Sequence, residues 1–412
     1  MMNSKYVIIG NSHAAVGCIE GIRSADAAGT VTVISKEKRP AYGRPLISYY
    51  LQGKTTPEKM RYRSADYYEK NGVKVIYGEA AAVEPRTKTV LLKDGSMISY
   101  DKLMYAAGSV PFLPPMPGLD GTKHFSFMTM DDAEALEAAI SCESRVLIIG
   151  AGLIGLKCAE GIYGRVASIT VADLAGRILP SVYDEKASGI MMAHLESKGI
   201  RFRLGVSVAA FENGAAVFTD GVREDFDIIV TAVGVRPNIG ILKEAGAECG
   251  RGVLTDAKSR TSLPGIYAAG DCTQYDDISS GQNRIMAILP NAYEQGRIGG
   301  INMAGGEASF DNAFPINSLG LFGLHTVTAG SYDGDSVEFD ENGYKKLFFR
   351  DDRLIGFIIM GDVTGSGIYS ALIRNRTPLS SIDFELTAHK PQLLGFDKAA
   401  RKEMLGGAHC EN

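Results

Sequence analysis

A glycine-rich turn at residues 150–155 has the most specific chemistry in the sequence. The run Gly-Ala-Gly-Leu-Ile-Gly follows the strand-like residues 145–149 and opens a helical stretch. In such a turn the first glycine permits the tight bend, the second lets the backbone approach a pyrophosphate, and the third allows close packing of helix on strand. The helix N-terminus then faces the phosphates. We predict a dinucleotide site formed by Gly150, Gly152, Leu153, Ile154 and Gly155.

Asp173 follows the next strand-like run, residues 168–172. A carboxylate at this position accepts a hydrogen bond from the 2′-hydroxyl of an adenosine ribose. It also repels a 2′-phosphate. The sequence therefore predicts that this site binds NAD(H) in preference to NADP(H).

Another, more degenerate turn, which is the first along the chain, follows the strand-like residues 6–9. Its sequence, Gly-Asn-Ser-His-Ala-Ala, keeps one glycine, and serine and alanine stand where the other two would be. Small side chains still admit a backbone close to phosphate. We predict a second dinucleotide-binding turn formed by Gly10, Ser12, His13, Ala14 and Ala15.

Asp271, late in the chain, follows Gly270 and the apolar run 266–269. A carboxylate at the end of a buried strand needs a partner, because an unpaired buried charge is costly. A flavin ribityl chain, whose hydroxyls would donate to the carboxylate, is one natural partner. The pairing of an opening turn with this late Gly-Asp dipeptide favours a functional dinucleotide site at the turn of residues 10–15.

These motifs require two similar α/β units. The strand–turn–helix–strand pattern of residues 5–35 returns at residues 145–172, which is typical of an internal duplication. The predicted fold class is α/β, with two Rossmann-type three-layer dinucleotide-binding domains and a C-terminal α+β domain. We expect a split FAD-binding domain at 1–114 and 239–312, an NAD-binding domain at 115–238, and the C-terminal domain at 313–412.

Composition excludes several classes of protein. The chain has 43 Lys and Arg against 48 Asp and Glu, a net charge of −5, so it lacks a nucleic-acid footprint. No apolar run reaches the ~18 residues of a membrane span, and the N-terminal residues do not form a secretory signal. We therefore expect a cytoplasmic protein with no membrane span and no nucleic-acid partner.

The cysteines and histidines lack the spacing of metal ligands. Six cysteines are scattered without a C-x-x-C or C-x₄-C pair, and the six histidines show no ligand pattern. This argues against an iron–sulfur cluster, a zinc site or a redox dithiol in the chain. We expect no metal site, so any cluster would belong to a partner protein.

Together the motifs resemble those of the FAD-dependent pyridine nucleotide-disulfide oxidoreductase superfamily over nearly the full length of the chain. The likeness is greatest to rubredoxin and ferredoxin reductases and to the flavin domain of NADH-dependent nitrite reductases. The resemblance implies that the C-terminal domain is an interface domain. The motifs that carry it are residues 10–15, 42–48, 106–108, 150–155, 234–237 and 265–271.

The resemblance also implies positions around the flavin. Arg44 and Pro45 would lie against the isoalloxazine, and Asp271 would hold the ribityl chain. A helix beginning near Pro290 would point its positive end at the flavin O2 edge and stabilise the negative charge of a reduced flavin. The other cofactor-binding positions are Ser35, Lys36 and Glu37 near the adenosine ribose, with Ala106, Ala107, Gly108, Gly234, Gly270, Asn291 and Ala292.

Two features depart from the family. Its disulfide reductases carry redox cysteines near the flavin, whereas residues 39–56 contain none. Many relatives have a glutamate two residues after the third glycine, paired with a lysine beside flavin N5; here Lys157 and Tyr49 hold those positions. A half-buried ammonium needs an anionic neighbour, which a reduced flavin would supply. We expect Lys157, with Arg44 and Pro45, to act in catalysis, and the alternative is a solvent-exposed lysine on the helix flank.

These observations favour a FAD-dependent NADH oxidoreductase that passes electrons between NAD(H) and an iron–sulfur or rubredoxin-type carrier without a redox-active cysteine. An NADH oxidase or peroxidase that uses oxygen is the first alternative, and a cofactor-binding regulatory or structural subunit is the second. The sequence leaves open the acceptor, the direction of electron flow, and whether the chain is a homodimer or a subunit of a larger redox complex.

Carriers of this kind are commonly acidic, so we expect a locally basic docking face. Basic residues occur in the C-terminal third of the chain, although each could be an ordinary solvated charge. The candidates are Lys345, Lys346, Arg374, Arg376, Lys398, Arg401 and Lys402.

Overall fold

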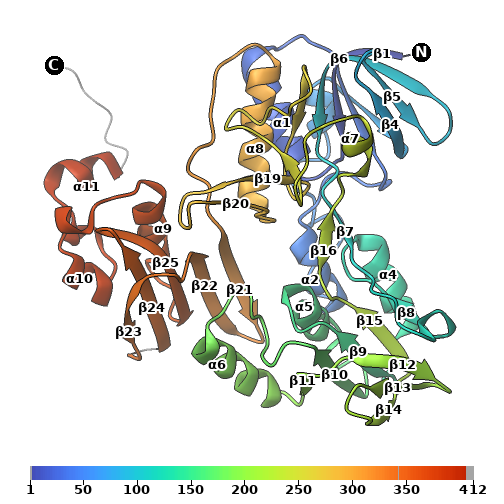
Figure 1. Cartoon of the computed structure of the whole chain (residues 1–412), viewed down its shortest axis with the longest axis vertical. Helices are drawn as coiled ribbons and strands as arrows, with labels where there is room; N and C mark the ends of the chain where they lie inside the picture. The colour runs from blue at the N-terminus through green and yellow to red at the C-terminus, as the bar shows by residue number, and fades with distance from the viewer. Residues whose placement is uncertain (1, 342, 405–412) are drawn as a thin grey trace. The chain divides into compact units, whose positions relative to one another are not determined.

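The computed structural model describes residues 2–341 and 343–404, and the chain divides into two compact units (Figure 1). Unit 1 comprises Met1–Tyr275 with Asn283–Asp311, and unit 2 comprises Asp276–Gln282 with Asn312–Asn412. Buried apolar clusters lie within each unit.

Unit 1 contains a seven-stranded sheet. Its strands are β1 (Met2–Ile9), β2 (Val31–Ser35), β3 (Val73–Tyr77), β4 (Ala80–Glu84), β5 (Thr89–Leu92), β6 (Met97–Tyr105) and β18 (Ile266–Ala268). The order is β3-β2-β1-β6-β5-β4, with β18 also paired to β6. Along β1, Tyr6 and Ile8 enter one apolar cluster and Val7 and Ile9 enter another. Both faces of this strand are therefore buried, as a parallel sheet in a layered α/β domain requires.

Two helices of this domain, α1 and α8, pack closely against each other at glycine residues. The helical segments that accompany the sheet are α1 (His13–Ala25), η1 (Arg44–Leu46), α2 (Ile47–Leu51), α3 (Tyr67–Lys70), α7 (Gly240–Glu244) and α8 (Leu289–Met303). A Cβ on Gly17 of α1 would meet the Tyr293 carbonyl oxygen at 2.2 Å, and a Cβ on Gly296 of α8 would meet the Ala14 carbonyl oxygen at 2.0 Å. The backbones of α1 and α8 therefore touch, and Figure 1 shows the helices side by side.

A second parallel sheet lies later in unit 1. Its strands are β8 (His124–Phe125), β9 (Arg145–Ile149), β10 (Ser168–Asp173), β11 (Arg201–Leu204) and β15 (Ile228–Thr231), in the order β11-β10-β9-β15-β8. All four pairings are parallel. The helices between these strands are α4 (Met130–Ala139), α5 (Leu153–Ile162) and α6 (Glu185–Glu196).

Short strands complete unit 1 and its connections. The segments that enter and leave the second sheet, β7 (Ser109–Pro111) and β16 (Val235–Pro237), pair with each other. The Pro-rich stretch that follows β7 includes the 3-10 turn η2 (Leu119–Gly121). Two further small sheets are formed by β12 (Val208–Glu212), β13 (Ala215–Phe218) and β14 (Arg223–Asp225), and by β17 (Val253–Leu254), β19 (Thr273–Asp277) and β20 (Gln282–Arg284).

Unit 2 is built on an antiparallel sheet of order β21-β22-β25-β24-β23. Its strands are β21 (Ile316–Leu321), β22 (Leu324–Gly330), β23 (Asp335–Phe339), β24 (Gly343–Arg350) and β25 (Arg353–Gly361). Its helical segments are α9 (Ser366–Arg374), η3 (Leu379–Ser381), α10 (Phe384–His389), η4 (Leu393–Gly395) and α11 (Lys398–Met404). Phe357 of β25 and Tyr369 of α9 are fully buried in its core.

The predicted fold class is confirmed: an α/β part on a mixed sheet, in which β4, β5 and β6 pair antiparallel, and an α/β part on a parallel sheet are followed by an α+β part. The domain boundaries at 114/115, 238/239 and 312/313 stay predictions. Across residues 2–341 and 343–404, no helix has the length and apolar character needed to cross a membrane. Within those same ranges, no group of three or more His, Cys, Asp and Glu side chains could hold a metal ion.

Candidate functional site

The second turn, residues 150–155, joins β9 to α5. Gly150 has φ +115°, and a Cβ there would lie 2.2 Å from the Ala232 carbonyl oxygen. Its N–H donates to the Ala172 carbonyl (2.7 Å). A Cβ on Gly155 would meet the Gly150 carbonyl oxygen at 2.0 Å. The first and third glycines of the motif are therefore required by the fold of the turn itself, before any ligand is considered.

The N-terminus of α5 is left open at Gly152. This N-cap residue supplies no side-chain cap, the first turn of α5 has no acidic residue, and a Cβ on Gly152 would enter open space. Other helices of the same part are closed: Thr129 and Asp132 form a capping box on α4, and Asp184 caps α6. An uncapped helix start with free N–H groups is suited to an anion such as a pyrophosphate.

The Asp173 carboxylate closes on the second turn from the end of β10. Its Oδ2 accepts the Ala151 N–H (2.7 Å) and its Oδ1 accepts the Ala175 N–H (2.8 Å). Each carboxylate oxygen keeps a further lone pair. Asp173 can therefore fix the turn and still accept a ribose hydroxyl, the role predicted from the sequence.

The first turn, residues 10–15, repeats this geometry between β1 and α1. Gly10 has φ +110°, and a Cβ there would lie 2.1 Å from the Ala106 carbonyl oxygen. Its N–H donates to the Ile34 carbonyl (2.9 Å). Ser12 is the N-cap of α1 but makes no side-chain cap bond, and the first turn of α1 has no acidic residue. The degenerate motif thus builds the same kind of open helix start.

His13 at the start of α1 is buried, with 4% of its surface exposed. Its ring centroid lies 4.1 Å from that of Tyr62, and its Nδ1 is 3.3 Å from the Ser12 hydroxyl. Burial, and then the charges of Arg44 and Arg63, lower the pKa of His13 from 6.5 to about 4. The imidazole is therefore neutral at pH 7 and adds no charge to the helix start.

Arg44 and Glu37 form an ion pair in the loop after β2. Arg44 Nη1 also donates to the Met128 carbonyl (3.2 Å), and the Tyr42 hydroxyl donates to Glu37 Oε2 (2.8 Å). The sequence predicts Glu37 at the adenosine ribose and Arg44 at the isoalloxazine, which are opposite ends of FAD. The ion pair ties the two side chains to each other in the absence of a ligand, and the predicted places of Glu37 and Arg44 along FAD stay predictions.

Asp271 follows β18 and is half-buried. The Ser109 hydroxyl donates to its Oδ2 (3.3 Å), and burial raises the pKa of the carboxyl above its ordinary value. Gly270 before it has φ +84°, and its N–H donates to Gln295 Oε1 (2.9 Å). A ligand hydroxyl that donates to Asp271 would stabilise its ionised form, as predicted for a ribityl chain.

The helix predicted to face the flavin begins at Leu289, two residues before Asn291. Its N-cap residue is Ile288, which supplies no side-chain cap, and the first turn of α8 has no acidic residue. Asn291 and Ala292 are buried. α8 therefore joins α1 and α5 as a third open helix start, with its positive end free to face an anion.

Lys157 lies on α5 and is paired with a residue that the sequence prediction missed, Glu160. Lys157 Nζ lies 2.5 Å from Glu160 Oε2, and the two side chains are 16% and 9% exposed. The ammonium also lies 4.7 Å from the centroid of the Tyr49 ring. The solvent-exposed alternative for Lys157 is therefore wrong. A lysine and a glutamate three apart on a helix face are the signal that could have found this pair.

The remaining predicted residues differ in surroundings. Gly108 has φ +65° and Gly234 has φ +115°, and a Cβ on either would enter open space. The Ser35 hydroxyl donates to the Glu37 carbonyl (2.7 Å), whereas Lys36 reaches out to Glu79 (3.3 Å) at the surface. Ala14, Ala15 and Ala106 are buried, and Ala107, Leu153 and Ile154 are partly exposed.

The cysteines of unit 1 differ in their exposure, and three of them are fully buried. Cys18, Cys158 and Cys272 are fully buried, and burial raises the pKa of each thiol, that of Cys272 to about 12. Cys142 is exposed and Cys249 is partly exposed, and the sixth cysteine, Cys410, lies outside the described residues. A thiol with a raised pKa is a poor nucleophile at neutral pH.

Profiles of two known protein families match the chain. The profile of the Pyridine nucleotide-disulphide oxidoreductase family matches residues 4–296. The profile of the Rubredoxin NAD+ reductase C-terminal domain matches residues 315–377. Both of the predicted turns lie within the first match.

Similar proteins include redox subunits and reductases. The NADH-dependent phenylglyoxylate dehydrogenase subunit epsilon of Aromatoleum evansii is 31% identical over 94% of this chain and 95% of its own length. The NADH-rubredoxin oxidoreductase of Clostridium acetobutylicum is 26% identical over 93% of this chain and 98% of its own length. The nitrite reductase (NADH) large subunit of Escherichia coli is 28% identical over 97% of this chain, which spans 49% of that subunit.

Solved structures share the fold. A covalent putidaredoxin reductase–putidaredoxin complex matches with a TM-score of 0.85 at 24% identity, over 100% of both chains. The NADH:rubredoxin oxidoreductase from Clostridium acetobutylicum matches with a TM-score of 0.73 at 24% identity, over 90% of this chain and 95% of that chain. At this level of identity the likeness supports the fold.

Proposed function

The chain belongs to the pyridine nucleotide-disulphide oxidoreductase family, whose members use FAD and NAD(H), and from this premise we propose which protein it serves. This oxidoreductase passes electrons between NADH and a small iron–sulfur or rubredoxin-type protein, without a redox-active cysteine of its own. The observation that carries the proposal is the flavin-side segment 39–56, which contains no cysteine to accept electrons from the flavin.

The residues of the first turn fit FAD. α1 and α8 both begin without side-chain caps or acidic residues, as anion-binding helix starts do. The start of α1 would hold the pyrophosphate, Arg44 would lie against the isoalloxazine, and Glu37 would accept from the adenosine ribose. Asp271, whose carboxylate is half-buried beside Ser109, would accept from a ribityl hydroxyl. When bound, FAD would supply the exchange between a two-electron hydride and single electrons.

The residues of the second turn fit NADH. The start of α5 at Gly152 is open, and Asp173 is held in place by the Ala151 and Ala175 N–H groups. A preorganised carboxylate loses little freedom when a ribose hydroxyl binds to it. It would also repel the 2′-phosphate of NADPH. The chain's contribution here is orientation and discrimination between the two dinucleotides.

We propose that Lys157 sets the electrostatics of the flavin ring. Its ammonium is buried beside Tyr49, and Glu160 balances part of its charge. Lys157→Met should lower the midpoint potential of the flavin, whereas Glu160→Gln should raise it, because the ammonium loses its carboxylate. A shift of ~30 mV corresponds to about 1.4 kcal/mol for a two-electron couple. Equal potentials in the wild type and both variants would contradict this role.

Proteins with related sequences support the choice of acceptor. One relative is an NADH-rubredoxin oxidoreductase, and the profile matched by residues 315–377 is that of a Rubredoxin NAD+ reductase domain. The electron carrier is an external partner, because the described residues include no cluster of metal ligands.

Oxygen is the second candidate acceptor. An NADH oxidase of Methanocaldococcus jannaschii is 32% identical over 74% of this chain and 71% of its own length. An oxidase would not need a docking surface for a protein. The absence of a cysteine at 39–56 disfavours a thiol-based oxidase but leaves direct reaction of the flavin with oxygen open.

The test compares acceptors directly. Purified FAD-loaded protein is mixed with NADH and with rubredoxin or a [2Fe–2S] ferredoxin, and carrier reduction is followed against oxygen consumption. We expect reduction of at least one carrier to be faster than oxygen consumption, and NADH to be a better donor than NADPH. If every carrier is reduced more slowly than oxygen, the oxidase takes the place of this proposal.

A further inference from the structure

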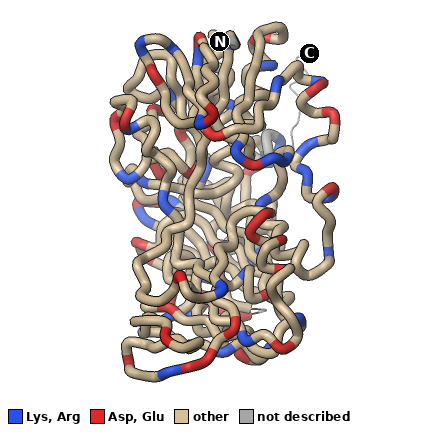
Figure 2. Tube along the Cα trace, turned by 90° about the vertical axis from the view of Figure 1, so that its right-hand side faces the viewer, with Lys and Arg blue, Asp and Glu red and all other residues tan. Residues whose placement is uncertain are grey.

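One segment of unit 1 carries an unusual charge. Over most of the trace Lys and Arg alternate with Asp and Glu (Figure 2), and the whole chain has a net charge of −5. Residues 36–63 contain eight Lys and Arg but only two Asp and Glu. This segment includes Arg44 and Pro45, the residues that the sequence predicts at the flavin.

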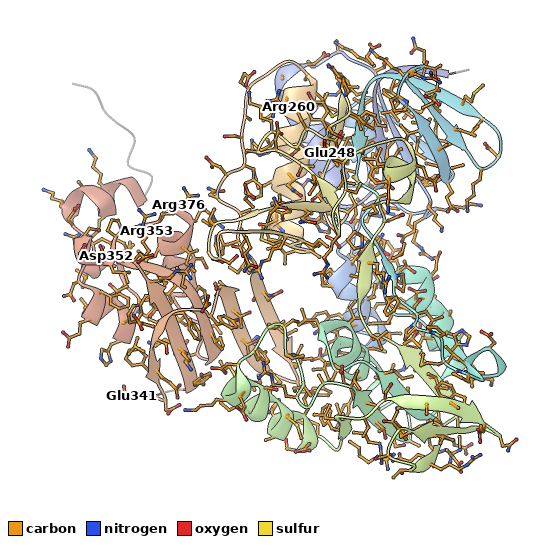
Figure 3. The ribbon with its side chains drawn as sticks, in the orientation of Figure 1. Glu248, Arg260, Glu341, Asp352, Arg353 and Arg376 are labelled. Carbon is orange, nitrogen blue, oxygen red and sulfur yellow. The ribbon has the colours of Figure 1, made fainter. Side chains whose placement is uncertain are left out.

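The C-terminal unit does not have this bias. Residues 313–412 contain ten Lys and Arg against thirteen Asp and Glu. Among its cations, Arg350 Nη1 lies 3.7 Å from Asp333 Oδ2, and Figure 3 labels Arg353 and Arg376 together with Asp352 and Glu341 in this unit. Unit 2 as a whole therefore lacks the charge bias of residues 36–63, and a basic face formed by its exposed lysines, such as Lys398 and Lys402 of α11, stays a prediction.

Lys345 and Lys346 of that expected face have structural roles. Lys345 Nζ donates to the Ala388 carbonyl (2.6 Å) and the His389 carbonyl (2.8 Å) at the C-terminal end of α10. Lys346 Nζ lies 3.7 Å from Glu338. Burial lowers the pKa of Lys345. A lysine that caps carbonyls in this way is poorly placed to meet a partner.

The basic segment of unit 1, residues 36–63, folds so that its last residues pair with the stretch just before Arg44 and Pro45. The Gly43 N–H donates to the Met60 carbonyl (2.9 Å), and the Tyr62 N–H donates to the Ala41 carbonyl (2.9 Å). Tyr42 and Arg61 form an antiparallel bridge between these hydrogen bonds. Residues 60–62 therefore pair with residues 41–43, so Arg61 lies beside the loop that contains Arg44.

Part of this charge is already neutralised within unit 1. Arg39 pairs with Asp131 (2.9 Å) and Glu134 (2.6 Å), and Arg63 pairs with Glu20 (2.7 Å). Four other cations are exposed and form no ion pair with the residues that the structure describes, and they constitute the basic rim. The basic rim consists of Lys38, Lys54, Lys59 and Arg61.

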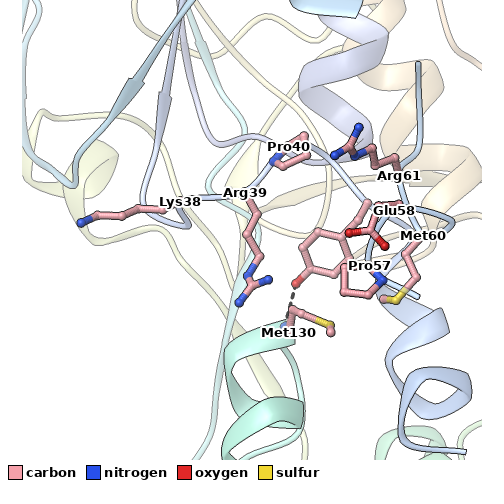
Figure 4. Close-up of a pocket in the computed structure, with 9 residues that line it drawn as sticks. Lys38, Arg39, Pro40, Pro57, Glu58, Met60, Arg61 and Met130 are labelled. Atoms are coloured by element: carbon pink, nitrogen blue, oxygen red, sulfur yellow. Dashed lines mark hydrogen bonds between the residues drawn. The ribbon is translucent and has the colours of Figure 1, made fainter. Parts of the chain in front are cut away.

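A pocket of about 230 Å³ lies within the basic rim. Tyr42, Met60 and Met130, all buried, form its apolar part. Figure 4 shows Lys38 and Arg61 on opposite sides of the pocket. Glu58 also lines the pocket, and its carboxylate interacts with the charge of Arg61. A partly apolar pocket flanked by more cations than carboxylates suits a protein surface with an apolar side chain among carboxylates, because the charges steer the encounter and the apolar contact orients it.

We propose that the basic rim and its pocket are the docking surface for a small acidic iron–sulfur or rubredoxin-type carrier. This inference rests on the proposed function and names the surface that serves it. Pro45, predicted against the flavin ring, is exposed in the loop beside this surface. A carrier bound there would therefore meet the protein at its flavin loop, and unit 2 would not supply the charges that guide it.

The experiment uses two triple charge reversals of equal size on the FAD-loaded full chain. The first, Lys38→Glu with Lys59→Glu and Arg61→Glu, reverses the rim. The matched control, Lys390→Glu with Lys398→Glu and Lys402→Glu, changes three exposed lysines of unit 2. Three properties are measured: the KM for rubredoxin and for a [2Fe–2S] ferredoxin, the carrier Kd by calorimetric titration without NADH, and the rate of flavin bleaching by NADH.

We expect the rim variant to raise the carrier KM and Kd by about tenfold or more at low ionic strength, and the difference to shrink as salt is added. Bleaching by NADH should stay within about twofold of wild type in both variants. If the triple variant loses FAD, the three single reversals replace it, since each side chain is exposed.

Two other outcomes overturn the proposal, and the behaviour of the wild-type protein toward a carrier distinguishes them. If the wild type reduces a carrier but the rim variant binds it as tightly, or the control variant loses as much, the docking surface is wrong and the proposed function stands. If the wild type neither binds nor reduces a carrier, the proposed function fails and the docking surface fails with it.

Discussion

The two Gly-rich turns of unit 1 have the same backbone and different side chains. Gly10 and Gly150 adopt φ +110° and +115°, and a Cβ on either would lie about as close to a carbonyl oxygen, at 2.1 and 2.2 Å. In both turns this glycine N–H donates to the carbonyl that precedes the last residue of the next strand. The first glycine is therefore the position that the turn itself cannot do without.

The other positions differ because a different side chain forms the hydrogen bond that fixes the second residue of each turn. Asp173 at the end of β10 holds the second turn by accepting the Ala151 N–H. In the first turn, Asn11 is held instead: its Nδ2 donates to the Arg39 carbonyl (3.2 Å), and the Tyr68 hydroxyl donates to its Oδ1 (2.6 Å). Similar turns can thus be built from different sequences, provided that some side chain fixes the second residue.

Among the variants that test this comparison of the two turns, Gly10→Ala is expected to have the largest effect on the free energy of unfolding. The added methyl would overlap the Ala106 carbonyl oxygen, and alanine is strained at φ +110°. We expect the free energy of unfolding to fall by about 3 kcal/mol or more and FAD to be lost, as measured by denaturant unfolding and flavin absorbance. Gly150→Ala should destabilise the protein by a similar amount.

The control for this prediction is Gly53→Ala. Gly53 also has a positive φ, +68°, but a Cβ there would meet nothing within 4 Å. Strain alone should cost about 1–2 kcal/mol. Equal losses of stability for Gly10→Ala and Gly53→Ala would mean that the approach to Ala106 is unimportant, and the comparison of the two turns would break down.

A smaller effect is expected from pH, and it should arise at the first turn alone. His13 stands where the second turn has Leu153, and its folded pKa of about 4 lies below the ordinary 6.5. The neutral ring therefore contributes stability above pH 6.5, and this contribution is lost as pH falls through about 4. At roughly 1.4 kcal/mol per unit, the loss amounts to about 3 kcal/mol.

The measurement is urea unfolding of the FAD-free protein between pH 4 and 7.5. His13→Gln removes the titrating group, so the free energy of unfolding of this variant should depend less on pH than that of the wild type. Parallel curves for the two proteins would show that His13 does not titrate on unfolding, and the two turns would then be alike in pH response.

The smallest effect is expected at Asp173. Asp173→Ser should slow flavin bleaching by NADH about tenfold and leave NADPH less affected, because hydrogen bonds to a charged group contribute roughly 1.5–3 kcal/mol. Asp173→Asn keeps one oxygen that can accept the Ala151 N–H, so it should retain more stability than Asp173→Ser. Anaerobic stopped-flow reduction checks the first expectation. A wild-type preference for NADPH would remove Asp173 from the role of discriminating residue.

The sequence predicts those parts of the site that are local along the chain. The second turn, its flanking strand and Asp173 lie within one short stretch, and their spacing identifies them. The ion pair of Arg44 with Glu37 also lies within eight residues, but its direction depends on Tyr42 and Met128, which the fold brings together. The sequence analysis therefore did not predict the ion pair between these two side chains.

Contacts between distant segments could not be predicted in the same way. The basic rim depends on the pairing of residues 59–62 with 41–43, and no motif reports that pairing. The role of Lys345 as a cap depends on α10, more than forty residues later. A charge count along the chain therefore cannot identify a docking face by itself, because the count ignores which cations, such as Lys345, already bind groups within the fold.

The glycine crossing of α1 and α8 has a consequence for synthesis on the ribosome. Gly17 of α1 packs against the backbone of Tyr293 in α8, so α1 cannot pack against α8 until almost three quarters of the chain has been synthesised. At roughly 5–20 residues per second, that wait lasts on the order of 15 to 55 s. The strands and helices from β8 to β15 form one continuous stretch and can pair during that time. A nascent chain would therefore complete first the part predicted to bind NAD(H), and last the part predicted to bind FAD.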